Sequence, residues 1–151
     1  MLKQLYVDKY WKAAQDACAG TPIFPLLALA ESAVESGWGG SQLAIQANNM
    51  FGVKAFSSWK GKTITMHTRE YKPDGTPYFI DAPFRAYDDV TDSFKDYVSV
   101  VENARYIAKG VNNATTIEEQ IADIEAGGYS TSPTYAATII SVANGLKEYL
   151  P

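Results

Sequence analysis

The amino-acid sequence predicts an α+β fold, in which a mostly helical domain carries one small β-hairpin lobe. Apolar residues recur at helical spacing through most of the chain. One segment, residues 62–82, instead alternates with period two on both sides of a Pro-Asp-Gly turn, as the two strands of a hairpin do. The length of 151 residues suits a single domain. We therefore expect one domain over residues 1–151.

Three helices are expected before the hairpin. The first covers residues 2–19 and places Cys18 on its apolar stripe, so we expect a buried structural thiol there. The second covers residues 25–36, because Pro25 is tolerated in a first turn and two glycines follow the apolar stretch. A short third helix is expected over about residues 41–47.

Three more helices are expected after the hairpin. One covers about residues 90–102. The next begins at Thr116, which forms a capping box with Glu119 three residues later. Ser132 is expected to cap the last helix, with Pro133 at its first position.

Composition excludes several classes of function. Thirteen basic and seventeen acidic residues give a net charge of −4, which argues against general nucleic-acid binding. A single Cys and a single His leave no intramolecular disulfide and no multi-His metal site. The sequence also contains no phosphate-binding loop and no dinucleotide-binding fingerprint. We therefore expect neither a metal nor a cofactor.

The N-terminal residues contain no long apolar segment of the kind that secretory signal peptides carry. Elsewhere no run of apolar residues is long enough to span a membrane. We therefore expect a protein that does not insert into membranes and stays in the cytoplasm unless another system exports or releases it.

Glu35 is the first candidate for chemistry. It falls in the last turn of the helix expected over residues 25–36, where the negative end of the helix dipole disfavours a carboxylate. The apolar side chains of Val34 and Trp38 reduce its hydration, and both effects raise the pKa of a carboxyl, as a general acid requires. The alternative is a solvated surface glutamate, which is our interpretation of Glu31, one turn earlier.

Glu70 is the second candidate. Strand alternation puts it on the more apolar face of the hairpin, which it shares with Ile64, Met66 and Thr68. A charge on that face conflicts with the local pattern. A catalytic carboxylate and a charge that protects a sheet edge from aggregation both explain it.

Aromatic residues are abundant, and several fall in loops or at the ends of elements, where rings can stack on sugar faces. These are Trp38, Phe51, Trp59, Tyr71, Tyr87 and Tyr129. Core packing is the alternative, and we prefer it for Trp11 and Phe84.

A series of motifs, in order along nearly the whole chain, resembles glycoside hydrolase family 73, the bacterial and phage endo-β-N-acetylglucosaminidases of the lysozyme-like superfamily. The motifs are an Ala-rich helix that runs into "ESGWGGS", then "NNMFGVK", "TREY", "FRAY" and "GYSTSPTYA". Ser132 stands where the family often has Asp, and both residues are good N-caps. The resemblance implies a lysozyme-like fold with a cleft between the helices and the hairpin lobe.

The resemblance also implies roles for individual residues. Glu35 would be the general acid that protonates the glycosidic oxygen, and Glu70 the second carboxylate. Tyr129 would lie near Glu35 and either position it or stabilise positive charge on the sugar. The positions implied to bind substrate are Trp38, Asn49, Phe51, Tyr87 and Tyr135.

The implied reaction is hydrolysis of the β-1,4 bond between N-acetylglucosamine and N-acetylmuramic acid in bacterial peptidoglycan. A muramidase or lytic transglycosylase acting on the same polymer is an alternative, as is a non-catalytic glycan-binding or assembly protein of the same fold. Inversion, retention and assistance by the 2-acetamido group of the substrate all stay open. We expect a monomer without a separate wall-binding module, which reaches the wall after release or export, as a phage-type endolysin or an effector does.

Overall fold

The computed structural model describes residues 2–151. The elements before and within the hairpin are α1 (Leu2–Cys18), α2 (Pro25–Glu35), α3 (Gln42–Ala47), β1 (Thr63–Tyr71) and β2 (Pro77–Arg85). Those after it are α4 (Val90–Val101), α5 (Ala104–Ile107), the 3-10 turn η1 (Val111–Asn113), α6 (Ile117–Ala126), α7 (Tyr135–Leu146) and the 3-10 turn η2 (Lys147–Tyr149). Within residues 2–151 no helix is long and apolar enough to cross a membrane.

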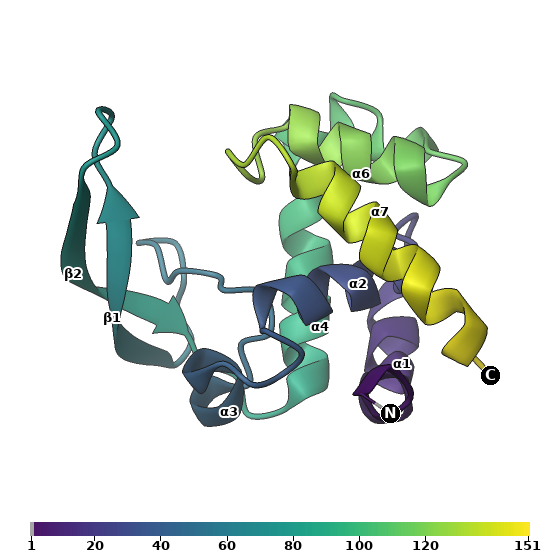
Figure 1. Ribbon diagram of the computed structural model, residues 1–151, viewed down its shortest axis with the longest axis horizontal. Coiled ribbons are helices and arrows are strands. Elements are labelled where there is room, and N and C mark those ends of the chain that lie inside the picture. Colours follow the sequence, from purple (N-terminus) through teal and green to yellow (C-terminus); the bar gives the residue numbers. More distant parts are fainter. Residues whose placement is uncertain (1) are drawn as a thin grey trace.

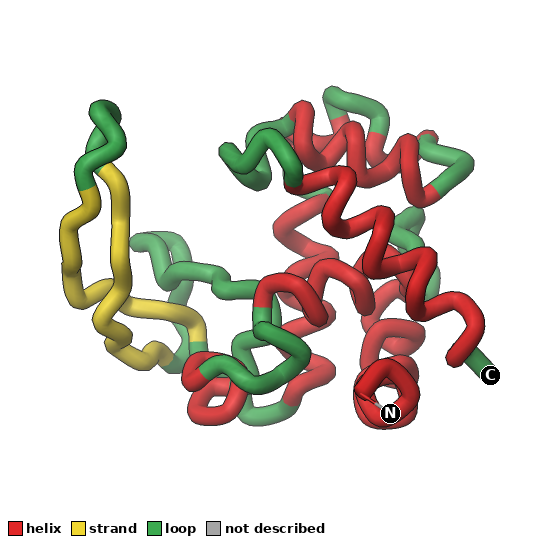
Figure 2. Tube along the Cα trace, in the orientation of Figure 1, coloured by secondary structure: helices red, strands yellow, loops and turns green. Residues whose placement is uncertain are grey.

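The molecule has two parts of unequal size (Figure 1). The helices pack into one body, and the hairpin stands to one side of it, connected through the loop that follows α3. Within residues 2–151, strands occur in this two-stranded hairpin alone, while helices make up most of the rest (Figure 2). The predicted α+β class, with a small β-lobe inserted into a helical chain, is confirmed.

Helix α2 is the centre of the helical body. It packs against α1 and α7, with further contacts to α4 and α6. All residues from Leu26 to Ala33 are buried, so the middle of this helix has no solvated face. At its start, the buried Gln120 side chain accepts a hydrogen bond from the backbone N–H of Phe24 at 2.9 Å. Gln120 thereby satisfies a group at the start of α2 that has no partner within the helix.

Helix α1 covers one side of α2. The Tyr6 hydroxyl and the Ser32 hydroxyl share a hydrogen bond of 2.8 Å between the two helices. Cys18, the last residue of α1, is buried in the core. Burial raises the pKa of its thiol to about 12, as expected of an unreactive structural cysteine.

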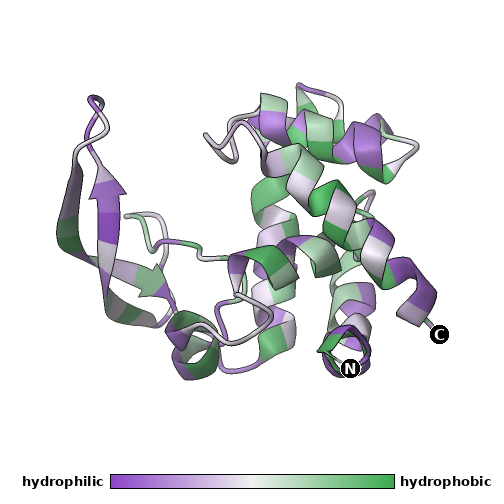
Figure 3. Ribbon diagram, viewed as in Figure 1, coloured by the Kyte–Doolittle hydropathy of each residue, from purple (hydrophilic) through white to green (hydrophobic). Residues whose placement is uncertain are grey.

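The strands pair in antiparallel register, with Thr63 opposite Arg85 and Glu70 opposite Tyr78. Exposure alternates along β1, and Glu70 lies on the more shielded face together with Ile64, Met66 and Thr68. The predicted alternation is therefore confirmed. Strand β2 stands apart from the helical body, and several of its hydrophobic residues are therefore exposed (Figure 3).

The loop that follows α3 runs along the base of the hairpin. The backbone N–H of Ala55 donates to the carbonyl of Pro83 at 2.9 Å, and that of Arg85 donates to the carbonyl of Val53 at 3.0 Å. Residues 53–55 therefore act as a short third segment beside β2. This arrangement places Lys54 beside Phe84 of β2, at the edge of the hairpin.

The last helix begins later than the sequence suggested. Helix α7 starts at Tyr135, and its N-cap residue, Thr134, makes no capping hydrogen bond through its side chain. The Ser132 hydroxyl instead accepts a hydrogen bond from the N–H of Thr134 at 3.4 Å, so it closes a local turn. The predicted start at Ser132 and Pro133 was therefore wrong by two residues.

Thr116 caps α6 as predicted, because its hydroxyl accepts a hydrogen bond from the N–H of Glu119 at 3.1 Å. The returning half of the capping box differs from the prediction. The Glu119 carboxylate accepts from the N–H of Thr115 at 2.9 Å, one residue before the N-cap. Both hydrogen bonds stabilise the start of α6, because each gives a partner to a backbone N–H that has none within the helix.

Candidate active site

A cleft of about 560 Å³ contains both predicted carboxylates, Glu35 and Glu70. Glu35 comes from the helical body and Glu70 from the hairpin, so each part of the molecule contributes one acid. The other lining residues come from the loop after α3, from the end of α4 and α5, and from the loop before α7. They are Phe51, Gly52, Val53, Lys54, Phe56, Val100, Arg105, Tyr106, Tyr129, Ser130 and Thr131.

A larger groove of about 660 Å³ lies between α1 and the C-terminal residues. The titratable side chains with carboxyl or amino groups that line it are those of Asp8, Lys12, Asp16 and Glu148, all exposed. We assign the active site to the smaller cleft, because there two acids from different parts of the fold face one space.

Glu35 is the last residue of α2, and a tight turn ends the helix directly after it. The buried Ser36 hydroxyl donates to a carbonyl of α2 at 2.6 Å and accepts from the N–H of Gly39 at 2.8 Å. Gly37, Trp38 and Gly39 have φ values of 56°, 58° and 80°. Glycine adopts this left-handed region without steric cost, which explains two of the three positions. The "ESGWG" motif therefore forms a turn that presents Glu35 at the helix end.

Trp38 fixes this turn to the core. Its ring packs edge-on against the ring of Tyr6, with 5.3 Å between the centroids. The backbone N–H of Trp38 donates to the backbone carbonyl of Ala33 at 2.8 Å. Trp38 is not among the residues that line the cleft. In the structure, the partly exposed Trp38 supports the turn that carries Glu35, and its predicted contact with substrate stays a prediction.

The environment of Glu35 suits a general acid. The residue is open to solvent, yet the surrounding protein displaces enough water to raise the pKa of its carboxyl above the ordinary value. The loop after α3 passes close by. Gly52 has a φ of 65°, and a Cβ atom at that position would lie 4.0 Å from Oε2 of Glu35. The carboxyl is thus accessible to a substrate, and its raised pKa lets it keep its proton to a higher pH than an ordinary glutamate does.

Glu70 forms an ion pair with Lys54 in the wall of the cleft. Both side chains are only partly exposed, and the cation comes from the loop that also passes Glu35. Sequence reasoning did not identify Lys54 as the partner, because the pairing depends on how this loop lies along β2. The ion pair gives Glu70 a defined position next to the space that a substrate would fill.

Glu31 is fully buried, although the sequence was interpreted as placing a solvated carboxylate there. Its Oε1 accepts a hydrogen bond from the hydroxyl of Tyr135, and the hydroxyl of Tyr97 lies 3.5 Å from the same oxygen. Burial is the main cause that raises the pKa of Glu31 to about 8, and the nearby charge of Glu35 adds to the effect. The interpretation was wrong because α2 is surrounded by other helices on all sides.

Tyr129 and Phe51 both line the cleft, and their rings lie on a cluster of aromatic side chains. Phe51 is itself buried and stacks on Tyr97 with 4.2 Å between the centroids. Tyr129 is partly buried and packs against Tyr97 and Tyr135 at 5.9 and 5.8 Å. Tyr135 does not line the cleft. Its ring is buried and its hydroxyl is bound to Glu31, so it supports the cleft from behind.

Tyr129 lies close to both carboxyls of α2. Burial is the main cause that raises its pKa well above the usual value, and the charges of Glu31 and Glu35 raise it further. A hydroxyl that keeps its proton can donate a hydrogen bond to a carboxylate or to a sugar oxygen.

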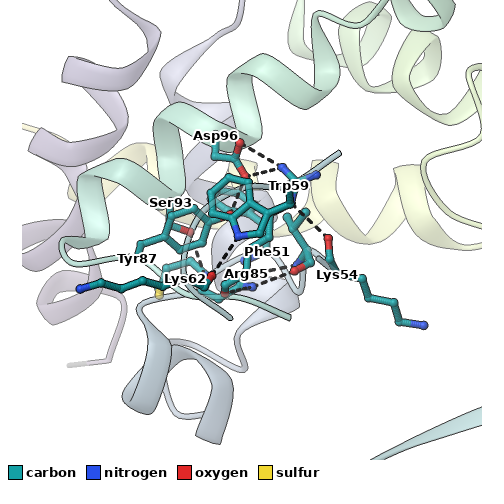
Figure 4. Close-up of polar contacts among 11 residues, drawn as sticks. Phe51, Lys54, Trp59, Lys62, Arg85, Tyr87, Ser93 and Asp96 are labelled. Carbon is teal, nitrogen blue, oxygen red and sulfur yellow. Dashed lines mark hydrogen bonds and ion pairs between the residues drawn. The ribbon is translucent and has the colours of Figure 1, made fainter. Parts of the chain in front are cut away.

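Asn49 and Tyr87 support the base of the hairpin and do not line the cleft. The buried Asn49 amide donates to the carbonyl of Arg85 at 2.8 Å. The Tyr87 hydroxyl donates to Asp96 of α4, whose carboxylate also pairs with Arg85 at 2.9 Å. Figure 4 shows this group, in which the guanidinium of Arg85 also lies 4.7 Å from the centroid of the Trp59 ring. In the structure, Asn49 and Tyr87 therefore stabilise the base of the hairpin.

Arg105 is a second cation of the cleft that sequence reasoning missed. It belongs to the short helix α5, and its guanidinium lies 5.0 Å from the ring centroid of Tyr106. Among residues 2–151, no carboxylate forms an ion pair with Arg105. No sequence motif includes Arg105, and exposed arginines are common on protein surfaces, so the sequence alone did not single it out.

Comparisons with known proteins identify relatives over nearly the whole chain. Residues 11–148 match the family described as mannosyl-glycoprotein endo-beta-N-acetylglucosaminidase. Peptidoglycan hydrolase FlgJ of Vibrio parahaemolyticus is 36% identical over 149 residues, which cover 95% of this chain and 47% of that protein. Exo-glucosaminidase LytG of Bacillus subtilis is 32% identical over 155 residues, which cover 97% of this chain and 53% of that protein. The chain spans about half the length of these curated relatives.

Solved structures share the fold. The catalytic domain of the autolysin Auto from Listeria monocytogenes superposes with a TM-score of 0.86 at 28% identity, covering 99% of this chain and 88% of that one. A C-terminally truncated glycoside hydrolase domain of FlgJ from Salmonella typhimurium gives a TM-score of 0.79 at 34% identity, covering 97% and 98%. The family match and these structures together show that the chain belongs to the mannosyl-glycoprotein endo-beta-N-acetylglucosaminidase family, glycoside hydrolase family 73.

Proposed function

We propose that this domain hydrolyses the glycan strands of bacterial peptidoglycan at the β-1,4 bond between N-acetylglucosamine and N-acetylmuramic acid. The observation that carries the proposal is the presence of Glu35 and Glu70 in one cleft, each from a different part of the fold. Relatives named as a peptidoglycan hydrolase and an exo-glucosaminidase support the choice of substrate.

Glu35 is the general acid of the proposed reaction. Its proton passes to the glycosidic oxygen while the bond from that oxygen to the anomeric carbon of N-acetylglucosamine breaks. The raised pKa of Glu35 supports this role, because it extends the pH range in which the carboxyl still carries its proton. The resulting carboxylate then accepts a proton from water or from another donor, which restores the enzyme.

Glu70 is the second carboxylate. As the glycosidic bond breaks, positive charge develops on the sugar ring, and a carboxylate in the opposite wall of the cleft stabilises it or accepts the proton of the attacking water. The ion pair with Lys54 supports this role, because it holds Glu70 toward the substrate space. Tyr129 serves as a hydrogen-bond donor beside Glu35.

The charges of the cleft are compatible with an anionic polymer. Two acids, Glu35 and Glu70, face two cations, Lys54 and Arg105, so the cleft is not negatively charged although the whole chain carries −4. Protonation of Glu35 makes the sum positive. Carboxylates of a peptidoglycan strand therefore meet no net repulsion in the cleft.

We also propose that the enzyme acts on the cell wall as a monomer, after release or export, in the manner of a phage-type endolysin. Sedimentation of the active protein tests this assignment, and a dimer would contradict it.

Mass spectrometry of the fragments released from purified peptidoglycan tests the cleaved bond. New reducing ends made of N-acetylglucosamine are expected. Reducing N-acetylmuramic acid would identify a muramidase, and anhydro-muramic ends would identify a lytic transglycosylase. Binding to walls without release of any fragment would identify a non-catalytic glycan-binding protein.

A further inference from the structure

Glu31 is a buried carboxyl that the proposed reaction does not use. It lies in α2, one helical turn before Glu35, and its side chain is fully shielded from solvent. Among residues 2–151, no Lys, Arg or His side chain forms an ion pair with it. A negative charge buried without a cation is strongly disfavoured. The surroundings therefore favour the neutral acid.

The groups that face Glu31 are all acidic. They are Glu35 on its own helix, Tyr97 from α4, Tyr129 from the loop before α7, and Tyr135 from α7. None of them carries a positive charge at any pH. The hydrogen bonds from Tyr135 and Tyr97 lower the pKa of Glu31, but burial, which has the largest effect, and the charge of Glu35 raise it, and the net direction is upward.

The two oxygens of Glu31 have different partners. Oε1 accepts the hydrogen bond of the Tyr135 hydroxyl, whereas Oε2 is buried without a partner among the described residues. In the neutral acid, Oε1 can remain the carbonyl oxygen and keep the bond to Tyr135, while the proton resides on Oε2. The rise of the Glu31 pKa to about 8 agrees with this form at neutral pH.

A chain of contacts leads from Glu31 to the cleft. The hydrogen bond fixes the ring of Tyr135, which packs against the ring of Tyr129 with 5.8 Å between the centroids. Tyr129 lines the cleft beside Glu35. We propose that Glu31 is a positioning residue which, as a neutral acid, holds Tyr135 and through it Tyr129 behind the general acid. This inference rests on the proposed function, because it assigns Glu31 a part in that reaction.

Substitutions of Glu31 that keep or remove its hydrogen-bond acceptor, while both remove its ability to ionise, test the proposal. Glu31→Gln keeps a carbonyl oxygen at nearly the same place, whereas Glu31→Leu removes it and leaves the Tyr135 hydroxyl unpaired. Tyr135→Phe removes the donor instead. We would measure kcat and KM on soluble peptidoglycan fragments from pH 4.5 to 9 for each variant and for the double variant Glu31→Leu/Tyr135→Phe.

The Gln variant is expected to keep kcat within about threefold of the wild-type value between pH 5 and 7, where Glu31 is neutral. Glu31→Leu and Tyr135→Phe are each expected to lower kcat about tenfold with KM within about twofold, because the general acid is less well supported in the transition state. The double variant is expected to be no worse than either single one, since both break the same contact.

Three results would overturn the proposal. One is a wild-type kcat in both Tyr135→Phe and Glu31→Leu, or in Tyr135→Phe alone if the Leu variant does not fold. Another is a kcat of Glu31→Gln that falls more than about threefold below the wild-type value between pH 5 and 7, where Glu31 is neutral, because the retained carbonyl oxygen would then not be what holds Tyr135. The third uses carbon NMR of the Glu31 carboxyl, which needs no activity: titration near 4.5 would contradict the neutral acid, and titration near 8 would support it. This last readout stands even if peptidoglycan proves not to be the substrate.

Discussion

Lys54 and Glu70 form an ion pair at the wall of the cleft, and the loop that carries Lys54 also passes beside Glu35 at Gly52. One loop therefore pairs with Glu70 and passes near Glu35. The hairpin and the helical body meet at this loop, so its conformation sets how the two acids face the substrate.

The ion pair predicts unequal effects of two substitutions. Glu70→Gln removes the second carboxylate and is expected to lower kcat on peptidoglycan by about 100-fold or more. Lys54→Met leaves the carboxylate but frees its side chain, so a smaller loss of about tenfold is expected. Kinetics on soluble fragments measure both, with Lys60→Met, a lysine of the same loop outside the cleft, as the control. A Lys54→Met enzyme as active as the control would contradict a positioning role for the pair.

The buried Glu31 predicts that stability falls as pH rises. Its folded pKa of about 8 lies above the ordinary value of 4.5, so the folded state binds more protons between these values. The stabilisation is complete below about pH 4.5 and is lost as pH rises through 8, on the order of 3–5 kcal/mol in total. Urea unfolding at pH 5 and pH 8 measures the loss. Glu31→Gln should remove most of this dependence, whereas the exposed Glu148→Gln should leave it unchanged; equal slopes in all three proteins would contradict the assignment.

Loss of the Arg85–Asp96 ion pair is predicted to destabilise the hairpin. Its side chains are only 13% and 18% exposed, and Asp96 also accepts from Tyr87. Asp96→Asn leaves the guanidinium without its anion and is expected to cost about 2 kcal/mol of unfolding free energy, less than the roughly 3–5 kcal/mol of a fully buried pair because both side chains are partly exposed. Hydrogen exchange in β1 and β2 should accelerate. Asp88→Asn, in an exposed pair with Lys62, should cost less than about 0.5 kcal/mol and serves as the control.

Arg105 predicts a preference for anionic substrates. Arg105 lines the cleft and has no ion-pair partner among the described residues. Arg105→Gln is expected to lower kcat/KM on peptidoglycan fragments about fivefold and to leave cleavage of neutral N-acetylglucosamine oligosaccharides unchanged. The wild-type preference should weaken as salt concentration increases. Equal losses on both substrates would show that Arg105 does not select for charge, and Lys109→Gln controls for a general loss of positive charge.

Local sequence signals predicted the parts of the fold that depend on local physics. Pro25 at a helix start, alternation along β1 and the Thr116 cap each follow from a few neighbouring residues, and each agrees with the structure. The position of Glu35 at a helix end was predictable for the same reason, because the glycines after it end α2.

The side-chain contacts that the sequence did not predict join distant segments. Glu31 was read as solvated because its partners, Tyr97 and Tyr135, lie far away in the sequence. Asn49 and Tyr87 were expected to bind substrate, yet they bond to the backbone and to a carboxylate at the base of the hairpin. A polar residue at a loop has the same local pattern whether it faces a substrate or supports a neighbouring strand.

The central claim is that Glu35 is the general acid, and Glu35→Gln tests it most directly. The variant keeps the size of the side chain but has no proton to transfer, so its unfolding curve should match that of the wild type. We predict that its kcat on purified peptidoglycan falls by at least about 100-fold, while Glu118→Gln, on the exposed side of α6, keeps full activity. A folded Glu35→Gln protein that releases fragments at a rate near that of the wild type would contradict the account.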